Sequence, residues 1–182
     1  KSRFAALPLG LLGLRLGATL ALTAGESPDQ PACDFAVLWE PVVHGRQDLE
    51  QEWRRKLLKE MMTFGRTRVT REALNRDLAE GRTIDFDGYP VTPALVRSLD
   101  GIRLDRPFAR VPRRVQIVGI GPTARVPPAY EALGEALGRQ GCVCDVAARR
   151  DVPFWNQVGL ASCHDLARET AQWMRRALGD AA

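Results

Sequence analysis

The sequence predicts an α/β domain built on a parallel sheet. Two short apolar runs, residues 7–12 and 35–39, lack polar alternation and have the character of strands buried on both faces of a sheet. Residues 115–178 then alternate strand and helix patterns with short connections. Strands and helices in this order form a parallel sheet with right-handed crossovers.

Composition supports a folded domain with a substantial core. Of the 182 residues, 45% are hydrophobic and 26% are charged, which excludes a disordered chain and a bundle of membrane helices. The 26 basic residues exceed the 22 acidic ones by four, but acidic residues separate the basic pairs and no aromatic residues interleave with them. We therefore expect no nucleic-acid partner.

The first element is a strand that leads directly into a helix. Residues 7–12 are expected to form the strand, residues 13–17 a turn, and residues 18–24 the helix. A polar loop follows, and then the second strand, 35–39, which ends at Glu40 because Pro41 has no N–H group for the sheet.

The N-terminus raises the question of a targeting segment. Two basic residues precede an apolar run over 4–14, as in a signal peptide. However, Arg15 would cost about 2.5–3.5 kcal/mol near the middle of a spanning segment, and proline and glycines interrupt the run. We expect a cytoplasmic protein without a membrane span, with secretion as the alternative.

The middle of the chain differs in composition and predicts a helical cap insertion over the core sheet. Helical patterns cover 48–62, 70–80 and 92–100, and Thr70 gives a partial capping signal. Residues 83–89 alternate like a short exposed strand that ends in a turn. The predicted organisation has three parts, namely core residues 1–45, the insertion 46–110, and core residues 111–182.

The C-terminal part continues the strand and helix alternation. Proline pairs typically open helices and glycines end them. The expected elements are a strand at 115–118, a loop at 119–125, a helix from Pro127-Pro128 to Arg139, a strand at 142–147 and a helix at 162–178.

The cysteines do not indicate a metal or redox site. Their spacing matches neither paired zinc knuckles nor the dense framework of a small secreted domain. Cys142 and Cys144 would share one face of a strand and behave as small buried hydrophobes, and Cys163 and His164 are interpreted as packing and capping residues. We expect reduced thiols, no metal and no cofactor.

The strand–turn–helix at 13–18, Gly-Leu-Arg-Leu-Gly-Ala, resembles the nucleophile elbow G-x-S-x-G of the α/β-hydrolase fold. More narrowly, segments 13–21, 37–43 and 152–156 resemble α/β-hydrolase-like proteins of serine-aminopeptidase type that accompany bacterial exosortase systems. The resemblance implies a parallel sheet with a helical cap and a hydrolase of ester, thioester or amide bonds. It also implies a link with exosortase or exopolysaccharide loci.

The catalytic residues of that family are not found at the matching positions. Arg15 stands in the serine slot, and a guanidinium can neither attack a carbonyl nor be deprotonated at working pH. Ala124 stands in the acid slot of segment 121–127, and residues 149–156 contain no histidine. Ordinary serine hydrolysis at Arg15 is excluded, and the catalytic residues are unknown.

The resemblance begins late in the family's fold. A complete member has about four strands before the elbow, whereas only about a dozen residues precede it here. Either the N-terminal strands are missing, or the elbow strand lies at an open sheet edge. An exposed apolar edge predicts aggregation or pairing with another chain, including a dimer.

Arg15 suggests a site for an anion. Together with the backbone N–H groups of Leu16 and Gly17 it would lie at a helix N-terminus, where a cation is unfavourable unless an anion joins it. The anion is either the carboxylate of Glu40, in an ion pair that closes a vacated site, or a bound carboxylate or phosphate. We expect the pocket to include Gly13, Glu40, His44 and Asp151, with His44 either a base or a solvated loop residue.

Two functions from different classes follow. The first is a hydrolase of ester, thioester or amide bonds that acts on a small-molecule or acyl substrate through groups outside the usual triad. The alternative is a non-catalytic pseudo-hydrolase that binds an anionic ligand or partner through Arg15.

Overall fold

The computed structural model describes residues 7–29, 33–67, 69–86, 88–156 and 162–179. The chain divides into two compact units. The first comprises Lys1–Val43 and Leu104–Ala182, and the second is His44–Arg103.

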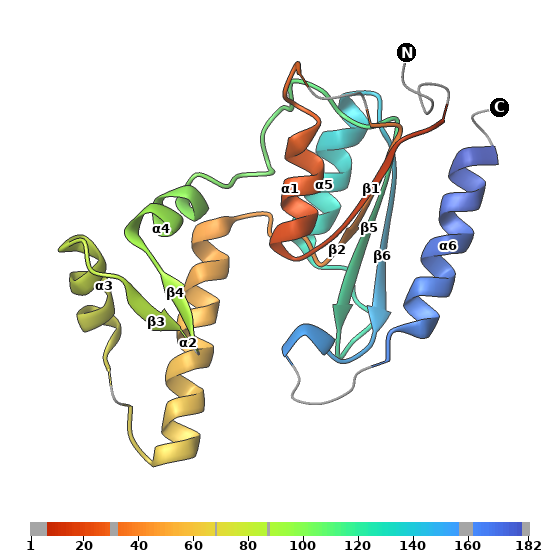
Figure 1. Ribbon diagram of the computed structural model, residues 1–182. Helices are drawn as coiled ribbons and strands as arrows, with labels where there is room; N and C mark the ends of the chain where they lie inside the picture. Colours follow the sequence, from red (N-terminus) through yellow and green to blue (C-terminus); the bar gives the residue numbers. More distant parts are fainter. Residues whose placement is uncertain (1–6, 30–32, 68, 87, 157–161, 180–182) are drawn as a thin grey trace. The chain divides into compact units, whose positions relative to one another are not determined.

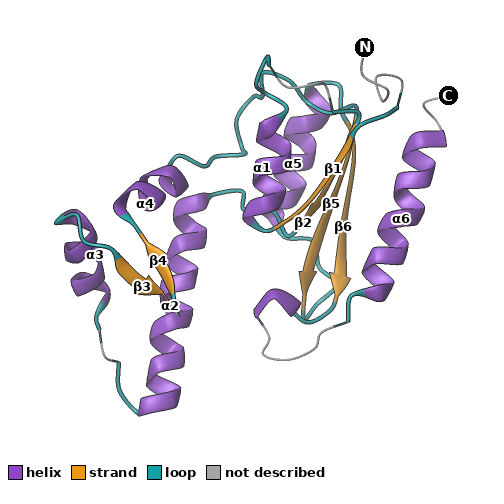
Figure 2. Ribbon diagram, in the orientation of Figure 1, coloured by secondary structure: helices purple, strands orange, loops and turns teal. Residues whose placement is uncertain are grey.

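The first unit is an α/β sandwich around a parallel sheet, as predicted. Its strands lie in the order β1-β2-β5-β6, and every neighbouring pair is parallel. Helices α1 and α5 lie on one face of the sheet and α6 on the other (Figures 1 and 2). The elements are β1 (Gly10–Leu14), α1 (Leu16–Ala24), β2 (Phe35–Trp39), β5 (Arg114–Gly121), α5 (Pro128–Arg139), β6 (Val143–Arg150), a short 3-10 turn (Phe154–Asn156) and α6 (His164–Gly179).

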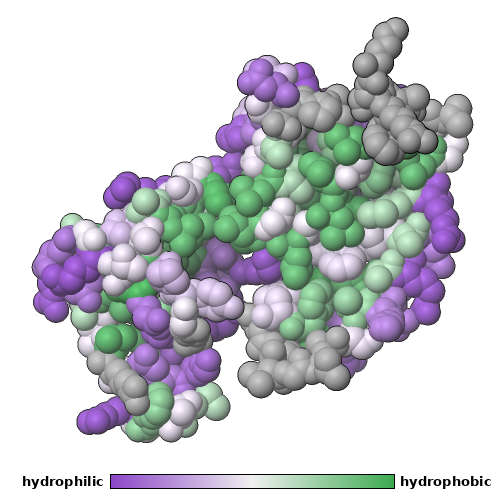
Figure 3. Space-filling model, viewed as in Figure 1, coloured by the Kyte–Doolittle hydropathy of each residue, from purple (hydrophilic) through white to green (hydrophobic). Residues whose placement is uncertain are grey.

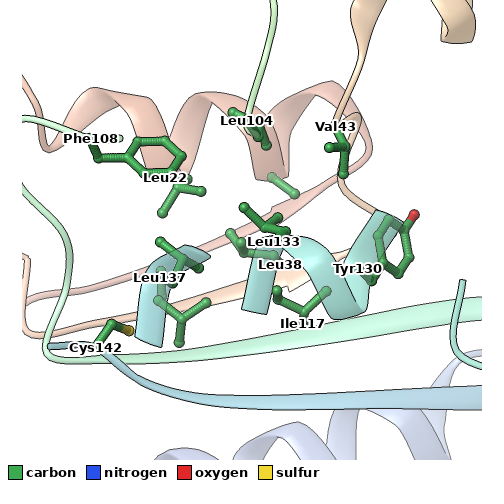
Figure 4. Packing of buried hydrophobic residues seen from close by; sticks show 13 residues of the cluster. Leu22, Leu38, Val43, Leu104, Phe108, Ile117, Tyr130, Leu133, Leu137 and Cys142 are labelled. Atoms are coloured by element: carbon green, nitrogen blue, oxygen red, sulfur yellow. The ribbon is translucent and has the colours of Figure 1, made fainter. Parts of the chain in front are cut away.

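Each face of this sheet has its own hydrophobic core. On one face, Leu38 and Ile117 of the central strands are fully buried against Leu22 of α1 and Leu133 of α5 (Figure 4). On the other face, Val37 packs with residues of α6, including the buried Trp173. The central strands are covered on both sides, which explains why β2 reads as a continuous apolar run.

The loop that returns from the second unit also contributes to the first core. Leu104 and Phe108, which fall within the predicted insertion, are 1% and 4% exposed and pack in the cluster that contains Leu38. The second unit accordingly ends at Arg103.

The strand register aligns the carboxyl ends of the sheet. Leu14 lies opposite Trp39, Trp39 opposite Val118, and Val118 opposite Ala147. The residues that follow these strands therefore emerge at one edge of the sheet, which is where α/β proteins place their sites.

Strand β1 lies at one edge of the described sheet. Leu12 on β1 and Leu20 on α1 are 48% and 57% exposed, and Figure 3 shows hydrophobic surface on the face that carries α1. This is the arrangement expected for an elbow strand at an open edge. Additional N-terminal strands and pairing with another chain stay predictions.

The second unit combines three helices with a two-stranded hairpin. Trp53, Leu74, Leu78 and Ile84 form its buried core. The hydroxyls of Thr70 and Thr92 cap two of its helices by accepting hydrogen bonds from the N–H groups of Ala73 and Leu95. The elements are α2 (Gly45–Phe64), α3 (Arg71–Ala79), β3 (Ile84–Phe86), β4 (Tyr89–Val91) and α4 (Pro93–Asp100). Its role as a cap stays a prediction.

Several element boundaries differ from those expected from the sequence. The first strand runs over Gly10–Leu14, so the turn before α1 is the single residue Arg15, not 13–17. The short strand ending in a turn that was expected over 83–89 is found as β3 and the turn at Gly88, which has φ 91° and donates its N–H to Asp85, but the antiparallel strand β4 that follows the turn was missed. The last two core strands also extend further than expected, to Gly121 and Arg150.

Within the described residues, no helix has both the length and the apolar character needed to cross a membrane.

Candidate anion site at the elbow

Arg15 alone connects β1 to α1, and its backbone is strained. It has φ 55° and ψ −125°, a conformation in which L residues with a side chain are rarely found. Such a conformation costs about 1–3 kcal/mol and persists only where surrounding contacts impose it. The Arg15 N–H donates to the carbonyl of Trp39 at 2.9 Å, and the Arg15 carbonyl accepts from Ala18 N–H at 2.9 Å. These bonds attach the turn to the sheet on one side and to the helix on the other.

Gly13 allows the strand and the helix to meet at this sharp angle. A Cβ atom on Gly13 would lie 2.3 Å from the carbonyl oxygen of Gly17 and 2.4 Å from the nitrogen of Ala18. Both are backbone atoms, so no side-chain movement relieves the clash. A Cβ on Gly17, by contrast, would meet nothing within 4 Å. Of the two elbow glycines, only Gly13 is required by packing.

The Arg15 side chain lies beside an aromatic cluster. Its guanidinium carbon is 5.9 Å from the centroid of the Trp155 ring, within the range of a cation–π interaction. Trp155 packs edge to face on Phe154, which packs in the same way on Trp39 at the end of β2. Sequence reasoning missed Trp155 as a partner of Arg15, although the segment that contains it, 152–156, carried part of the family resemblance.

Among the described residues, Arg15 and Glu40 are the two that have a positive φ without being glycine. At φ 48° the chain turns out of the sheet, and the carboxylate Oε2 accepts a hydrogen bond from Ile120 N–H at 2.6 Å. The Glu40 N–H donates to the carbonyl of Val118 at 2.8 Å. The Glu40 carboxylate thus takes the place of a β2 carbonyl and extends the pairing of β2 with β5. Glu40 follows the strand beside β1, and its ion pair with Arg15 stays a prediction.

The N-terminus of α1 contributes a positive electrostatic potential to the site. The helix begins at Leu16, so the N–H groups of Leu16 and Gly17 belong to a first turn that has no earlier helical carbonyl to bond. No acidic residue lies in this turn, and the side chain of Arg15, the N-cap residue, makes no capping hydrogen bond. The helix dipole and the guanidinium therefore have the same sign, which favours an anion beside them.

Asp151 belongs to a group of charges at the end of β6. Its N–H donates to the carbonyl of Gly121 at 2.9 Å, and its carboxylate lies 3.8 Å from Arg149. Arg149 also forms ion pairs with Asp165 and Glu169 of α6. The hydrogen bond that Arg149 donates to Glu169 raises the pKa of Arg149 most, and the neighbouring carboxylates add to the effect. Sequence reasoning named Asp151 but missed Arg149, whose partners are brought near by the packing of α6.

Two predicted residues lie elsewhere. Ala124 is exposed in the loop after β5 and offers no acid there. His44 belongs to the second unit, where it precedes α2 and its backbone bridges to Arg103. Its membership of the elbow pocket stays a prediction.

Of the two cysteines expected to share one face of a strand, Cys142 is buried and Cys144, on β6, is partly buried against the same core. Burial raises the pKa of the Cys142 thiol to about 11 and that of Cys144 to about 12, so neither is a thiolate near neutral pH. In the part of the chain that the structure describes, no group of three or more His, Cys, Asp or Glu side chains is arranged to hold a metal ion.

Comparison of the chain with models of known protein families gives no match, and comparison with curated proteins gives none either.

Proposed function

We propose that this chain is an α/β-hydrolase-like domain without ordinary serine hydrolysis, and that it binds the anionic group of a ligand or partner at the elbow. Arg15 and the N–H groups of Leu16 and Gly17 form the binding site. The observation that carries the proposal is the backbone of Arg15, whose φ of 55° places an arginine on a strained turn between a parallel strand and a helix N-terminus.

The chemistry of arginine supports binding rather than catalysis at this position. Its guanidinium is a poor nucleophile and a permanent cation, with five N–H donors in a plane that matches a carboxylate or phosphate. The Trp155 ring attracts the charge through its π face without occupying an N–H donor. Strain maintained at a turn is common where the geometry serves a site.

The test is binding of small anions, measured by calorimetry with inorganic phosphate and with acetate. Arg15→Gln should weaken binding about tenfold or more, because it removes a charge-assisted hydrogen bond worth about 1.5–3 kcal/mol. Arg139→Gln is the matched control. Arg139 is the last residue of α5, at the end of that helix away from the elbow, and its ion pair with Glu135 is 4.0 Å long. Equal affinity in the wild type and Arg15→Gln would refute the proposal.

The second candidate is a hydrolase of ester, thioester or amide bonds that uses groups outside the usual triad. It is favoured by the strained Arg15 turn and by the close approach at Gly13, both of which resemble a nucleophile elbow. A fluorophosphonate probe followed by mass mapping tests it. An adduct at a residue other than Arg15 would support a relocated nucleophile, and folded protein without an adduct would count against it. The proposed link with exosortase or exopolysaccharide systems rests on the sequence resemblance.

A further inference from the structure

The chain's excess positive charge is located in one segment of the second unit. Segment 54–66, which is the C-terminal half of α2 and the start of the loop after it, has five basic residues and one acidic residue. Its net charge of +4 equals that of the whole chain, so the rest of the sequence is neutral overall. A basic helical segment that also carries apolar residues is typical of a surface that binds an anionic partner.

Four large apolar side chains at this end of α2 are exposed to solvent. Leu58, Met61, Met62 and Phe64 are 60%, 47%, 79% and 49% exposed, and we call these four residues the α2 tip. Figure 1 shows the last turns of α2 extending past the hairpin and α3 of the second unit. Single exposed hydrophobic residues are common, whereas a cluster of them with a polar rim marks an interaction site.

The core of the second unit does not account for the α2 tip. Trp53 of the same helix is buried in that core. An α-helix turns about 100° per residue, so Leu58 lies about 140° and Met62 about 180° round the helix from Trp53. Helix α2 therefore has two apolar faces, whereas a helix that covers a single core has one. The face that carries Leu58 and Met62 points away from the core of the unit.

The charges around the α2 tip leave its outer surface positive. Glu60, the one acidic residue of the segment, lies 3.5 Å from Nζ of Lys56, and the two side chains are only 13% and 11% exposed. Lys56 also lies 5.3 Å from the centroid of the Phe86 ring on the hairpin. This pair is turned inward and cancels its own charge. The other basic residues of the segment are exposed, namely Arg54, Arg55, Lys59 and Arg66.

An anionic lipid surface matches this combination better than the other possible partners. A second copy of the chain would bring two positive surfaces together, which is unfavourable. A nucleic acid would contact the basic side chains through its phosphates and leave the apolar ones in water. An acidic protein would need a groove that fits the end of a helix and the turn after it, whereas a lipid surface adapts to that shape. Helices that lie at lipid surfaces combine these same residue types.

We propose that the α2 tip binds the second unit to an anionic lipid surface. Leu58 and Met62, one turn apart, enter the boundary between headgroups and acyl chains with the other two residues of the α2 tip. Arg54, one turn before Leu58 on the same face, binds lipid phosphates together with Lys59 and Arg66. Binding of this kind lies in the plane of the surface and needs no membrane span. The proposal is independent of the function proposed for the elbow.

Sedimentation of the full-length protein with lipid vesicles tests the proposal. Vesicles of phosphatidylcholine alone are compared with vesicles made of equal parts of phosphatidylcholine and phosphatidylglycerol. Only the anionic vesicles should bind the protein, and binding should weaken as salt is added because salt screens the charges. Equal binding to both kinds of vesicle, or binding to neither, would overturn the proposal.

The role of charge is tested by removing two basic residues at the α2 tip. Each Lys or Arg near an anionic membrane surface strengthens binding about fivefold, so Arg54→Gln combined with Lys59→Gln should lower the affinity about 25-fold. The matched control combines Arg76→Gln with Arg97→Gln, which removes the same charge from exposed positions on α3 and α4. The control should bind as the wild type does. Equal losses in the two double variants would refute a specific role of the α2 tip.

Insertion into the lipid is tested through the apolar residues. Leu58→Ser combined with Met62→Ser should lower the affinity at least about tenfold, whereas Leu95→Ser should not, because Leu95 lies on α4 and is 39% exposed. Met62→Trp adds a reporter, whose fluorescence brominated acyl chains should quench beyond any quenching in the wild type. Bound protein without this added quenching would be held by charge alone, which contradicts the proposed insertion.

Two other occupants of the α2 tip give distinct results, and either would overturn the proposal. An acidic protein partner is indicated if soluble polyglutamate, but no vesicle, binds the wild type and the variant with Leu58→Ser and Met62→Ser no longer binds it. A second copy is indicated if sedimentation velocity shows a dimer that the same variant dissociates. Circular dichroism of each variant verifies that it is folded.

Discussion

Replacement of the two elbow glycines by alanine should have opposite effects on stability. In Gly13→Ala, the new Cβ would lie 2.3 Å from the backbone oxygen of Gly17, so β1 and α1 must separate by about 1 Å to reach ordinary contact. Overpacking that requires a backbone shift costs about 1–3 kcal/mol. In Gly17→Ala, the new Cβ meets nothing within 4 Å, and alanine in a helix is favoured over glycine by about 0.5–1 kcal/mol.

The difference between the two variants is therefore about 1.5–4 kcal/mol in the free energy of unfolding. For a chain of this size, 1 kcal/mol corresponds to about 2–4 °C in the midpoint of thermal unfolding, so the two midpoints should differ by roughly 3–16 °C. Urea unfolding followed by circular dichroism gives the free energies, and a thermal scan gives the midpoints.

The matched pair makes the result specific. Both variants add one methyl group within the same five residues, so a general effect of alanine on the chain would be the same in both. If Gly13→Ala is as stable as the wild type, β1 and α1 do not cross as closely as described, and the strained turn at Arg15 would lose its structural cause.

Three further predictions concern strain, pH and thiol reactivity. Arg15→Gly should be more stable than Arg15→Ala by about 1 kcal/mol in urea unfolding, because glycine tolerates a positive φ; equal stability would contradict the strained turn. The hydrogen bond from Arg106, the largest cause, lowers the pKa of Glu26 below its unfolded value, so the stability it contributes is complete above about pH 4.3 and is lost as pH falls through the folded pKa. Glu26→Gln should therefore flatten the pH dependence of unfolding in that acidic range, and an unchanged profile would argue against the pair. At pH 8, roughly one in a thousand Cys142 thiols and one in ten thousand Cys144 thiols would be ionised; iodoacetamide should modify them only after unfolding, and rapid modification of folded protein would show that they are accessible.

Local patterns were sufficient to predict the parallel sheet of the first unit. The run 35–39 lacks polar alternation because both faces of β2 are covered. Pro128 begins α5, and Gly141 follows its end. Thr70 caps α3 through its hydroxyl, as the sequence predicted. These features depend on residues that are neighbours in the chain, so they can be predicted from the sequence alone.

The hairpin of the second unit shows where local reasoning was insufficient. Residues 83–89 predict a short strand that ends in a turn, but the three residues Tyr89–Val91 that form the returning strand are too few to show a period of their own. The returning strand is defined by the pairing of Ile84 with Val91, and this pairing depends on the apolar core formed with Trp53 and Leu74.

At the elbow, the sequence determined the identity of the site residues and tertiary structure decided what they do. The order Gly13, Arg15, Gly17 is visible in the sequence, but the contact that confines the turn to Arg15 is the packing of helix backbone on strand backbone. Trp155 comes to Arg15 across 140 residues of chain, and Glu40 bonds to a backbone N–H of β5, 80 residues away. Periodicity in the sequence indicates which face of an element is apolar. Contacts between distant segments, by contrast, form only when the strands pair in register and the helices pack on the sheet.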